Sequence, residues 1–473
     1  MTTVKNIPPH KGTYIPSEEE FTLQELDKIL SSTIKYDSPT KKILFLGMTL
    51  NYTREDQQNF AFNSPSSSGK TFVALEVANY FPTDDIVTLS YTSPTAFFHT
   101  QSVLVDENLS PMPQRKDYVD EWIEKWEESN SFPEKGQGRS EWKEKRRDKI
   151  RSLKVEWDQT QKYFMVDLEK KIIIFLDQPH DELLKKLRPL LSHDQKFLKV
   201  KITDKSREGG HKTKDIIMVG FPTVVFLSVN TSLDGQEKTR NFLLSPEVSQ
   251  NKLKASILQA SNTLANREAF RERVNQDRNR LKLMARVQDI KDADIQQIII
   301  NPEDMAYITR KFLDSHKPLE PRHQRDFPRL IAMIKGHALL NLFNRIRNPG
   351  IVWANRHDCD EGYNLYDSVS MANERGLPPY IYDFWDKSLK GCLTEEGLSR
   401  KEVSALYRGY YHTRIGKNSF KRLIDSLCEA GFVFEDKDPM DKRFIRIYPL
   451  GVGGKKSKLS MDGLLAPRYT QES

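Results

Sequence analysis

Apolar and polar positions along the first hundred residues predict helices and strands in alternation. Helices with an apolar stripe are expected at 21–33, 41–50 and 70–81; in the first of these, leucines recur at every third or fourth position. Short apolar strands are expected at 58–63 and 85–91. Alternation of this kind favours a parallel sheet between helices, so we expect an α/β fold.

The alternation stops between residues 101 and 165. Two highly charged helices are predicted there, around a turn that contains proline and glycine. We interpret this segment as an insertion between two strands of the sheet. Four of the six tryptophans lie in it. We interpret them as packing the helical pair onto the body of the protein, and stacking on nucleic-acid bases is the alternative.

The sheet pattern resumes after the insertion. Near-continuous apolar strands are predicted at 170–177 and 223–230, as expected for strands that are covered on both faces. Between them, 197–219 has the pattern of two strands joined by a turn at Gly209 and Gly210.

The second half of the chain is predicted to be mainly helical. Residues 251–299 are highly charged and mostly helical, 322–347 form an amphipathic helix, and 391–450 hold two helices and then two strands. A polar group at 356–361 is interpreted as a polar loop rather than a metal site. The expected segments are an N-terminal arm with a short helix (1–40), a core (41–250), a helical segment (251–350), a connector (351–390), a small mixed unit (391–450) and a tail (451–473).

Composition excludes several classes of protein. The chain has 473 residues, and 73 Lys and Arg against 66 Asp and Glu give a net charge of +7. No apolar run is long enough for a transmembrane helix, and the first twenty residues lack a secretory signal. The three cysteines, which are far apart, exclude a disulfide scaffold and a CxxC zinc site. We therefore expect a cytoplasmic protein without membrane contact, whose basic excess is compatible with nucleic acid.

A candidate phosphate-binding loop lies between the strand at 58–63 and the helix that follows. The segment SPSSSGKT ends in the Gly-Lys-Thr of the phosphate-loop pattern, and backbone N–H groups of such a loop wrap phosphates at the start of a helix. We expect Lys70 to reach the β- and γ-phosphates of ATP and the Thr71 hydroxyl to bind Mg²⁺. Serine replaces the usual glycine at position 64, which is costly if that position needs a positive φ. The predicted loop residues are Ser64, Pro65, Ser66, Ser67, Ser68, Gly69, Lys70 and Thr71.

Two further strands end in polar side chains suited to the same site. Asp177 ends a buried strand, so its carboxylate is expected at the carboxyl edge of the sheet, where it would join the Mg²⁺ shell. The next residue is Gln178, which can orient water but accepts a proton poorly. Hydrolysis is therefore expected to be slow, or to be helped by His180, Asp181 or Glu182. Asn230 ends the strand at 223–230 and could reach the γ-phosphate or the attacking water.

The order of these features resembles the AAA+ ATPases, and more narrowly the minichromosome maintenance helicases of plasmids, phages and other mobile elements. The resemblance covers about 41–350 and a winged-helix-like end. It rests on the hairpin 197–219, on EKTRNFLLS, and on RDFPRLIAMIKGHA with Arg325 and His337 at matching places. It implies a P-loop NTPase core, a helical lid at 251–350, a C-terminal winged helix and a hexamer-type ring. It also implies that Arg240 is the arginine finger and Arg325 the sensor-2 arginine, a charge-stabilising role in phosphoryl transfer.

Two basic surfaces are candidates for DNA contact. In the implied ring, the hairpin points into the pore and its cations track single-stranded phosphates without reading sequence. The second helix of the 391–450 unit carries outward cations at its start, and either DNA contact or packing against a partner explains them. The predicted DNA-binding residues are Lys199, Lys201, Lys205, Arg207, His211, Lys212, Lys214, Lys417, Lys421 and Arg422.

Three functions are consistent with these residues. The first is an ATP-dependent DNA helicase or translocase in replication, which forms a homo-oligomer and works with a primase or loader. The second is a replication initiator or helicase loader that uses ATP as an assembly switch, which Gln178 favours. The third is an NTPase associated with a primase or with defence, whose partner does the chemistry.

Overall fold

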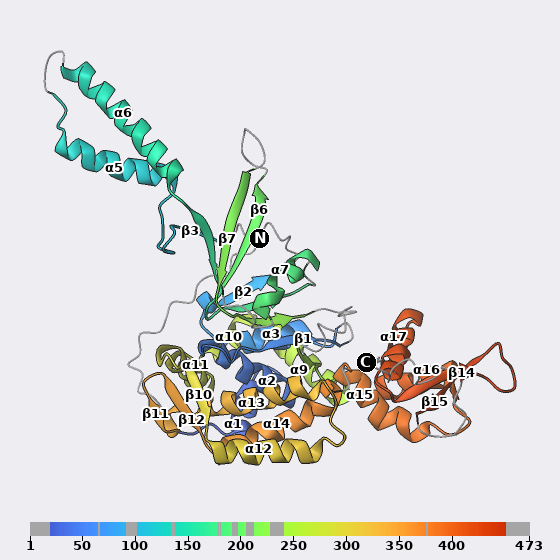
Figure 1. Cartoon of the computed structure of the whole chain (residues 1–473). Helices are drawn as coiled ribbons and strands as arrows, with labels where there is room; N and C mark the ends of the chain where they lie inside the picture. The colour runs from blue at the N-terminus through green and yellow to red at the C-terminus, as the bar shows by residue number, and fades with distance from the viewer. Residues whose placement is uncertain are drawn as a thin grey trace, which may run out of the picture.

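The computed structural model of the protein describes residues 19–64, 67–90, 102–133, 138–177, 179, 181–191, 197–204, 212–227, 241–374 and 377–450. Figure 1 shows a central body, a pair of strands and a pair of helices that project from it, and a small C-terminal unit beside it.

The body is built on a five-stranded sheet in which every strand is parallel to its neighbours. The order across the sheet is β2-β5-β8-β1-β9. These strands confirm the predicted α/β class and the four strands expected from the sequence. Their bounds are β1 (Asn59–Phe62), β2 (Ile86–Leu89), β5 (Ile172–Phe175), β8 (Thr223–Phe226) and β9 (Phe242–Leu244).

Alternate residues of each strand enter two different hydrophobic cores. In β5, for example, Ile172 and Ile174 belong to one buried cluster, whereas Ile173 and Phe175 belong to another. Because side chains alternate across a strand, an unbroken apolar run places apolar groups on both faces of the sheet.

Helices cover the first face. Buried residues of α1, α2, α3, α11, α13 and α14 form one continuous cluster with the sheet, so the predicted helical segment 251–350 shares its core with the predicted core segment 41–250. The helices on this side are α1 (Leu23–Leu30), α2 (Ser38–Thr49), α3 (Lys70–Ala78), α9 (Gln250–Ala265), α10 (Arg267–Asn275), α11 (Arg278–Asp292), α12 (Pro302–Ser315), α13 (His323–Leu340) and α14 (Arg356–Glu374). A small sheet joins them, formed by β10 (Gln297–Ile300), β11 (Arg347–Asn348) and β12 (Ile351–Ala354).

The second face is covered by α7 (Asp181–Leu191) and by strands of a four-stranded sheet. That sheet has the order β3-β4-β7-β6. The predicted hairpin 197–219 supplies β6 (Phe197–Asp204) and β7 (Lys212–Val219), and the flanks of the insertion supply β3 (Val103–Val105) and β4 (Tyr163–Asp167). The insertion and the hairpin therefore belong to one sheet, a pairing that we did not predict.

A joint of two short segments connects the two sheets. β4 leads into β5 through residues 168–171, and β7 leads into β8 through 220–222. β4 pairs in parallel with β7, and β5 pairs in parallel with β8. Hydrogen bonds cross the joint, from the Leu168 N–H to the Val219 carbonyl (2.8 Å) and from the Thr223 N–H to the Lys171 carbonyl (3.1 Å). Two paired strands thus continue from one sheet into the other.

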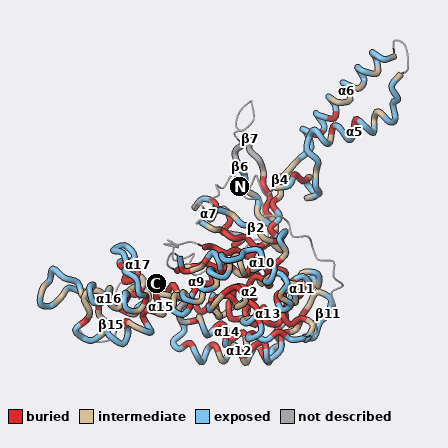
Figure 2. Tube along the Cα trace, turned by 180° about the vertical axis from the view of Figure 1, so that it is seen from behind, coloured by how far each residue is buried: buried red, intermediate tan, exposed pale blue. Residues whose placement is uncertain are grey.

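The two helices of the insertion, α5 (Arg115–Ser129) and α6 (Gly138–Gln159), project away from the body and are mostly exposed (Figures 1 and 2). Their aromatic side chains pack within the pair: the Trp126 and Trp142 rings lie 5.6 Å apart, and Trp142 contacts Phe132 at 5.0 Å. The prediction that the tryptophans pack this pair onto the body is therefore wrong, because the pair has a small core of its own.

The C-terminal unit has a separate core (Figure 2). It contains the two predicted helices and two predicted strands, together with a third strand that pairs with the last one. Its elements are α15 (Pro379–Phe384), β13 (Leu398–Ser399), α16 (Arg400–Tyr411), α17 (Lys417–Glu429), β14 (Val433–Lys437) and β15 (Ile445–Pro449).

One local prediction fails. The segment 356–361, which we expected to be a polar loop, is the start of α14. Its polar side chains misled the prediction, because Asp358 is buried and is paired with His337 of α13 and with Arg345. Within the described part of the chain, no helix is both long and apolar enough to cross a membrane.

Candidate phosphate-binding site

The predicted phosphate loop lies between β1 and α3, at the carboxyl edge of the central sheet. Gly69 precedes the first residue of α3 and has φ 90°, a conformation that glycine adopts without steric cost. Ser67 also has a positive φ, 63°, whereas Ser64 does not. The condition for a cost at Ser64 is therefore not met, and among the described serines of the loop the one with a positive φ is Ser67. Pro65 and Ser66 lie outside the described residues.

Lys70 is buried against the backbone of the loop. Its Nζ donates to the Ser64 carbonyl oxygen at 2.9 Å, and burial lowers the pKa of the ammonium. The Ser64 and Ser68 hydroxyl oxygens lie 2.6 Å apart and close the loop across its base. Lys70 is therefore held next to the start of α3, where the helix dipole and the N–H groups of the first turn favour an anion. Thr71, the next residue, is exposed.

Asp177 lies at the same edge of the sheet. It is exposed and follows β5. The register aligns Phe175 with Phe226 of β8, and Phe226 with Ala61 of β1. β8 thus separates Asp177 from the loop by two strand spacings, about 10 Å. A nucleotide whose phosphates occupy the loop can bring a metal ion within reach of this carboxylate.

Of the other predicted residues of the nucleotide site, Asp181 and Glu182 begin α7, where Glu182 is exposed. Four more fall outside the described residues. These are Gln178, His180, Asn230 and Arg240. β8, the strand that leads toward Asn230, is described, and it ends between the loop-bearing and acid-bearing strands.

The donor set suits Mg²⁺. Thr71 and Asp177 offer a hydroxyl and a carboxylate, which are oxygen ligands of the kind that this ion prefers. Among the described residues, no group of three His, Cys, Asp or Glu side chains could hold a metal ion. The ion would therefore take most of its ligands from the phosphates and from water, as Mg²⁺ does in nucleotide sites.

A second buried cation, Lys252, contacts the loop, and the sequence did not reveal it. It lies in the first turn of α9, and its Nζ is 2.6 Å from the Asp37 carboxylate and 3.3 Å from the Ser68 carbonyl oxygen. Burial lowers the pKa of Lys252 and raises that of Asp37, while their mutual attraction opposes both shifts. The base of the loop thus rests on an ion pair formed by the start of α2 and the start of α9.

Arg325 does not lie close to the phosphate loop. It is exposed in the first turn of α13. One turn further along, Arg329 donates to the Asn241 carbonyl at 2.7 Å. Asn241 precedes β9 and so lies at the amino edge of the sheet, opposite the loop. Within one chain, the structure does not bring Arg325 to Lys70, and a role for Arg325 across a subunit boundary stays a prediction.

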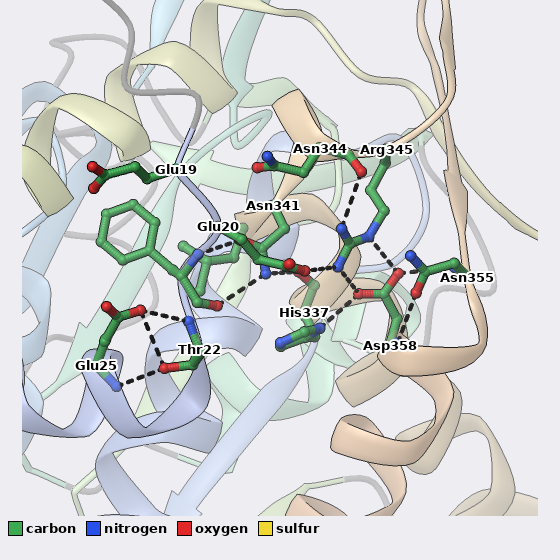
Figure 3. A network of polar contacts seen from close by, with 12 residues as sticks. Glu19, Glu20, Thr22, Glu25, His337, Asn341, Asn344, Arg345, Asn355 and Asp358 are labelled. Carbon is green, nitrogen blue, oxygen red and sulfur yellow. Dashed lines mark hydrogen bonds and ion pairs between the residues drawn. The ribbon is translucent and has the colours of Figure 1, made fainter.

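His337, the second residue matched in that helix, belongs to a polar network (Figure 3). Its Nδ1 lies 2.6 Å from Asp358, whose carboxylate also accepts two bonds of 2.7 Å from Arg345. Arg345 reaches Glu20 as well, at 2.6 Å. The network joins α13 and α14 to the segment that precedes α1, so it is a structural device away from the phosphate loop.

The described part of the predicted DNA surface is exposed. On β6, Lys201 is exposed, and Lys199 lies over the Tyr163 ring and 3.5 Å from Asp215. On α17, the exposed cations lie in the first two turns: Lys417, Lys421 and Arg422. The side chains of Lys212 and Lys214 on β7 are not among those described, and Lys205, Arg207 and His211 lie outside the described residues.

No protein-family model matches the chain, and no curated protein matches it.

Proposed function

We propose that the chain is an ATP-binding P-loop NTPase of the AAA+ type that moves DNA. The observation that carries the proposal is the loop between β1 and α3, where Gly69 turns the chain and a buried Lys70 ammonium lies at the start of the helix. Asp177 at the same edge of the parallel sheet supports it, since ligands of open α/β sheets bind at the carboxyl ends of the strands.

The residues would divide the work as follows. Lys70 would exchange the Ser64 carbonyl for a phosphate oxygen, because an anion offers its ammonium a stronger partner than a neutral carbonyl. Asp177 would hold the metal ion through its oxygens, and Gln178 and Asn230 would orient the attacking water. Mg²⁺, when bound, would neutralise charge that develops on the phosphates. Arg240 and Arg325 would act from a neighbouring subunit.

The projecting strands support DNA as the moved partner. Figure 1 shows β6 and β7 extending from the body, and exposed lysines on β6 suit phosphate contacts without sequence readout. The two helices and three antiparallel strands at the C-terminus are compatible with a winged helix, with the α17 cations toward DNA. Self-association is supported by α9, which exposes Ile257, Leu258 and Leu264.

A nucleotide-switched initiator or loader is the second candidate. The specific observation in its favour is the sequence at Asp177, where Gln178 follows instead of a carboxylate that could accept a proton. Slow hydrolysis suits an assembly switch better than a motor.

ATP hydrolysis by the full chain, with and without single-stranded DNA, tests these functions. Turnover that DNA raises, and that is lost in Lys70→Ala, is expected for a motor. Lys317→Ala, which removes an exposed lysine that follows α12, serves as the control and should keep turnover. ATP binding without turnover under both conditions would favour the switch, and no ATP binding would overturn both functions.

DNA contact is tested separately. Lys201→Ala combined with Lys199→Ala is expected to weaken binding of single-stranded DNA several-fold and to reduce its salt dependence. Lys317→Ala, which removes an exposed lysine of the body, is the matched control. Fluorescence anisotropy at two salt concentrations measures both effects, and equal affinity of the hairpin and control variants would contradict the DNA surface.

A further inference from the structure

The ion pair beneath the loop is fixed from several sides. Asp37 immediately precedes α2, is buried, and accepts the Glu247 N–H at 2.6 Å. The neighbouring Thr40 hydroxyl donates to the Ser245 carbonyl at 3.0 Å, which anchors the segment between β9 and α9. The position of the Lys252 ammonium is therefore set by the fold and not by the loop that it contacts.

The contact with Ser68 determines the direction of a backbone amide. In a trans peptide unit the C=O and N–H bonds point in opposite directions. Since the Ser68 carbonyl accepts from Lys252 at 3.3 Å, the Gly69 N–H of the same peptide points to the side opposite that carbonyl. Gly69 has φ 90°, and glycine permits backbone orientations that other residues resist. The Lys252 donor selects one of them.

We propose that Lys252 is a positioning residue of the phosphate site, which holds the Ser68–Gly69 peptide so that the Gly69 N–H donates to a bound phosphate oxygen. Lys252 does not touch the nucleotide and acts through this one peptide. A preoriented amide donor binds an anion without the cost of turning the peptide at the moment of binding. This role rests on the proposed nucleotide function and adds a residue that the loop motif does not contain.

The test must separate amide positioning from folding. Lys252→Met alone would leave the Asp37 carboxylate buried without its cation, which strongly destabilises a protein. We therefore compare two double variants, Asp37→Asn/Lys252→Met and Asp37→Asn/Lys252→Gln. Both remove the ion pair, and the two side chains are similar in length. Only glutamine can donate a hydrogen bond to the Ser68 carbonyl, so rescue by glutamine reports on that donor.

Binding of ATP with Mg²⁺ by the full chain, measured by calorimetry, gives the first readout. The methionine variant is expected to bind about ten-fold more weakly than the glutamine variant at equal thermal midpoints. Inorganic tripolyphosphate should show the same ratio, because the effect is on phosphate and not on the base. Lys254→Met, two residues further along α9 and exposed, should bind as the wild type does.

A spectroscopic signature gives the second readout. In protein labelled with ¹⁵N-glycine, the Gly69 amide resonance should move on ATP binding in the wild type and the glutamine variant, and little in the methionine variant. If the two double variants bind ATP equally well while Lys70→Ala has lost binding, the role of Lys252 is overturned and the proposed nucleotide function stands. Wild-type protein that binds no ATP would overturn the proposed function and this role with it.

Discussion

Asp358 shows how a single buried carboxylate organises the body. It is fully buried and accepts hydrogen bonds from Arg345, His337 and the Asn355 N–H. These partners come from α13, from the start of α14 and from the chain between them, and Arg345 extends the network to Glu20 (Figure 3). A charge in this position is tolerated because it is paired and its oxygens are hydrogen-bonded.

Asp358→Ala is expected to lower the free energy of unfolding by about 3–5 kcal/mol, because Arg345 would stay buried without its carboxylate. Asp360, two residues further along α14, is part-exposed, lies 3.5 Å from Lys311 and accepts a hydrogen bond from the Tyr307 hydroxyl at 2.8 Å. Asp360→Ala is therefore expected to cost at most about 1 kcal/mol. Urea unfolding of both variants measures the difference, and equal costs would contradict the assignment.

The same carboxylate predicts a dependence on pH. Burial opposes ionisation of Asp358, but hydrogen bonds from His337 and Arg345 outweigh it, so the pKa of Asp358 is lowered. Its contribution is present above the pKa of an unfolded aspartate, about 3.9, and is lost as the pH falls through the lower folded value. The stability advantage of the wild type over Asp358→Asn should therefore shrink below about pH 4. A stability advantage that stays constant down to pH 2 would contradict the stabilising role of the ionised Asp358 carboxylate.

At the scale of elements, the joint between the two sheets is tightly constrained. Gly220 has φ 90°, and a Cβ there would lie 2.5 Å from the Glu169 backbone nitrogen. Lys170, on the other connection, also has a positive φ, 56°. The two bends lie against each other, so neither strand can change course alone.

Gly220→Ala is expected to destabilise the protein by about 2–4 kcal/mol, through the left-handed backbone and the close approach. Gly409→Ala in α16 is the matched control, because a Cβ there meets no atom within 4 Å. It should stabilise its helix by about 0.5–1 kcal/mol. Chemical unfolding distinguishes the two, and destabilisation by both to the same degree would show that the joint is not special.

At the scale of the whole molecule, the described residues form more than one hydrophobic core. Leu339 belongs to the cluster shared by the sheet and its helices, and Leu427 belongs to the separate core of the C-terminal unit. Both side chains are fully buried. A unit with its own core can unfold on its own.

We expect calorimetry of the full chain to show two transitions. Leu427→Ala and Leu339→Ala should each remove about 2–5 kcal/mol from one transition and leave the other in place. If both variants shift a single common transition, the two cores are coupled and the division is wrong.

The elements of the sheet could be predicted because their patterns are local. An apolar run such as Ile172–Phe175 is buried on both faces, and this is visible in four consecutive residues. The pairing of β4 with β7 could not be predicted, since it depends on contacts that the pattern of neither strand encodes. The predicted loop at 356–361 failed for a related reason: Asp358 is polar in sequence, but its partners Arg345 and His337 make burial possible.

The candidate site divides in the same way. The loop can be recognised because its residues are consecutive in the sequence. The contribution of Lys252 cannot be recognised in this way, because Lys252 is far from the loop in the sequence. Lys252 and Lys254 look alike in the sequence, but only Lys252 is buried, where it pairs with Asp37. Asp37 lies 215 residues earlier in the chain, so the sequence around Lys252 does not reveal the pair. The cost at Ser64 had to stay conditional in the sequence, since the residue type does not show which position of a loop takes the positive φ.

The joint also has a mechanical meaning. Two hydrogen-bonded strands are stiffer than one connecting chain. Residues 168–171 and 220–222 therefore form a stiff connection between the two sheets. On one side of this connection lie β5, which leads to Asp177, and β8, which leads toward Asn230. On the other side lie β6, β7 and the projecting helices α5 and α6. We therefore expect a change in the direction of β5 and β8 at the carboxyl edge to be passed to β4 and β7, and so to the strands and helices that project from the body.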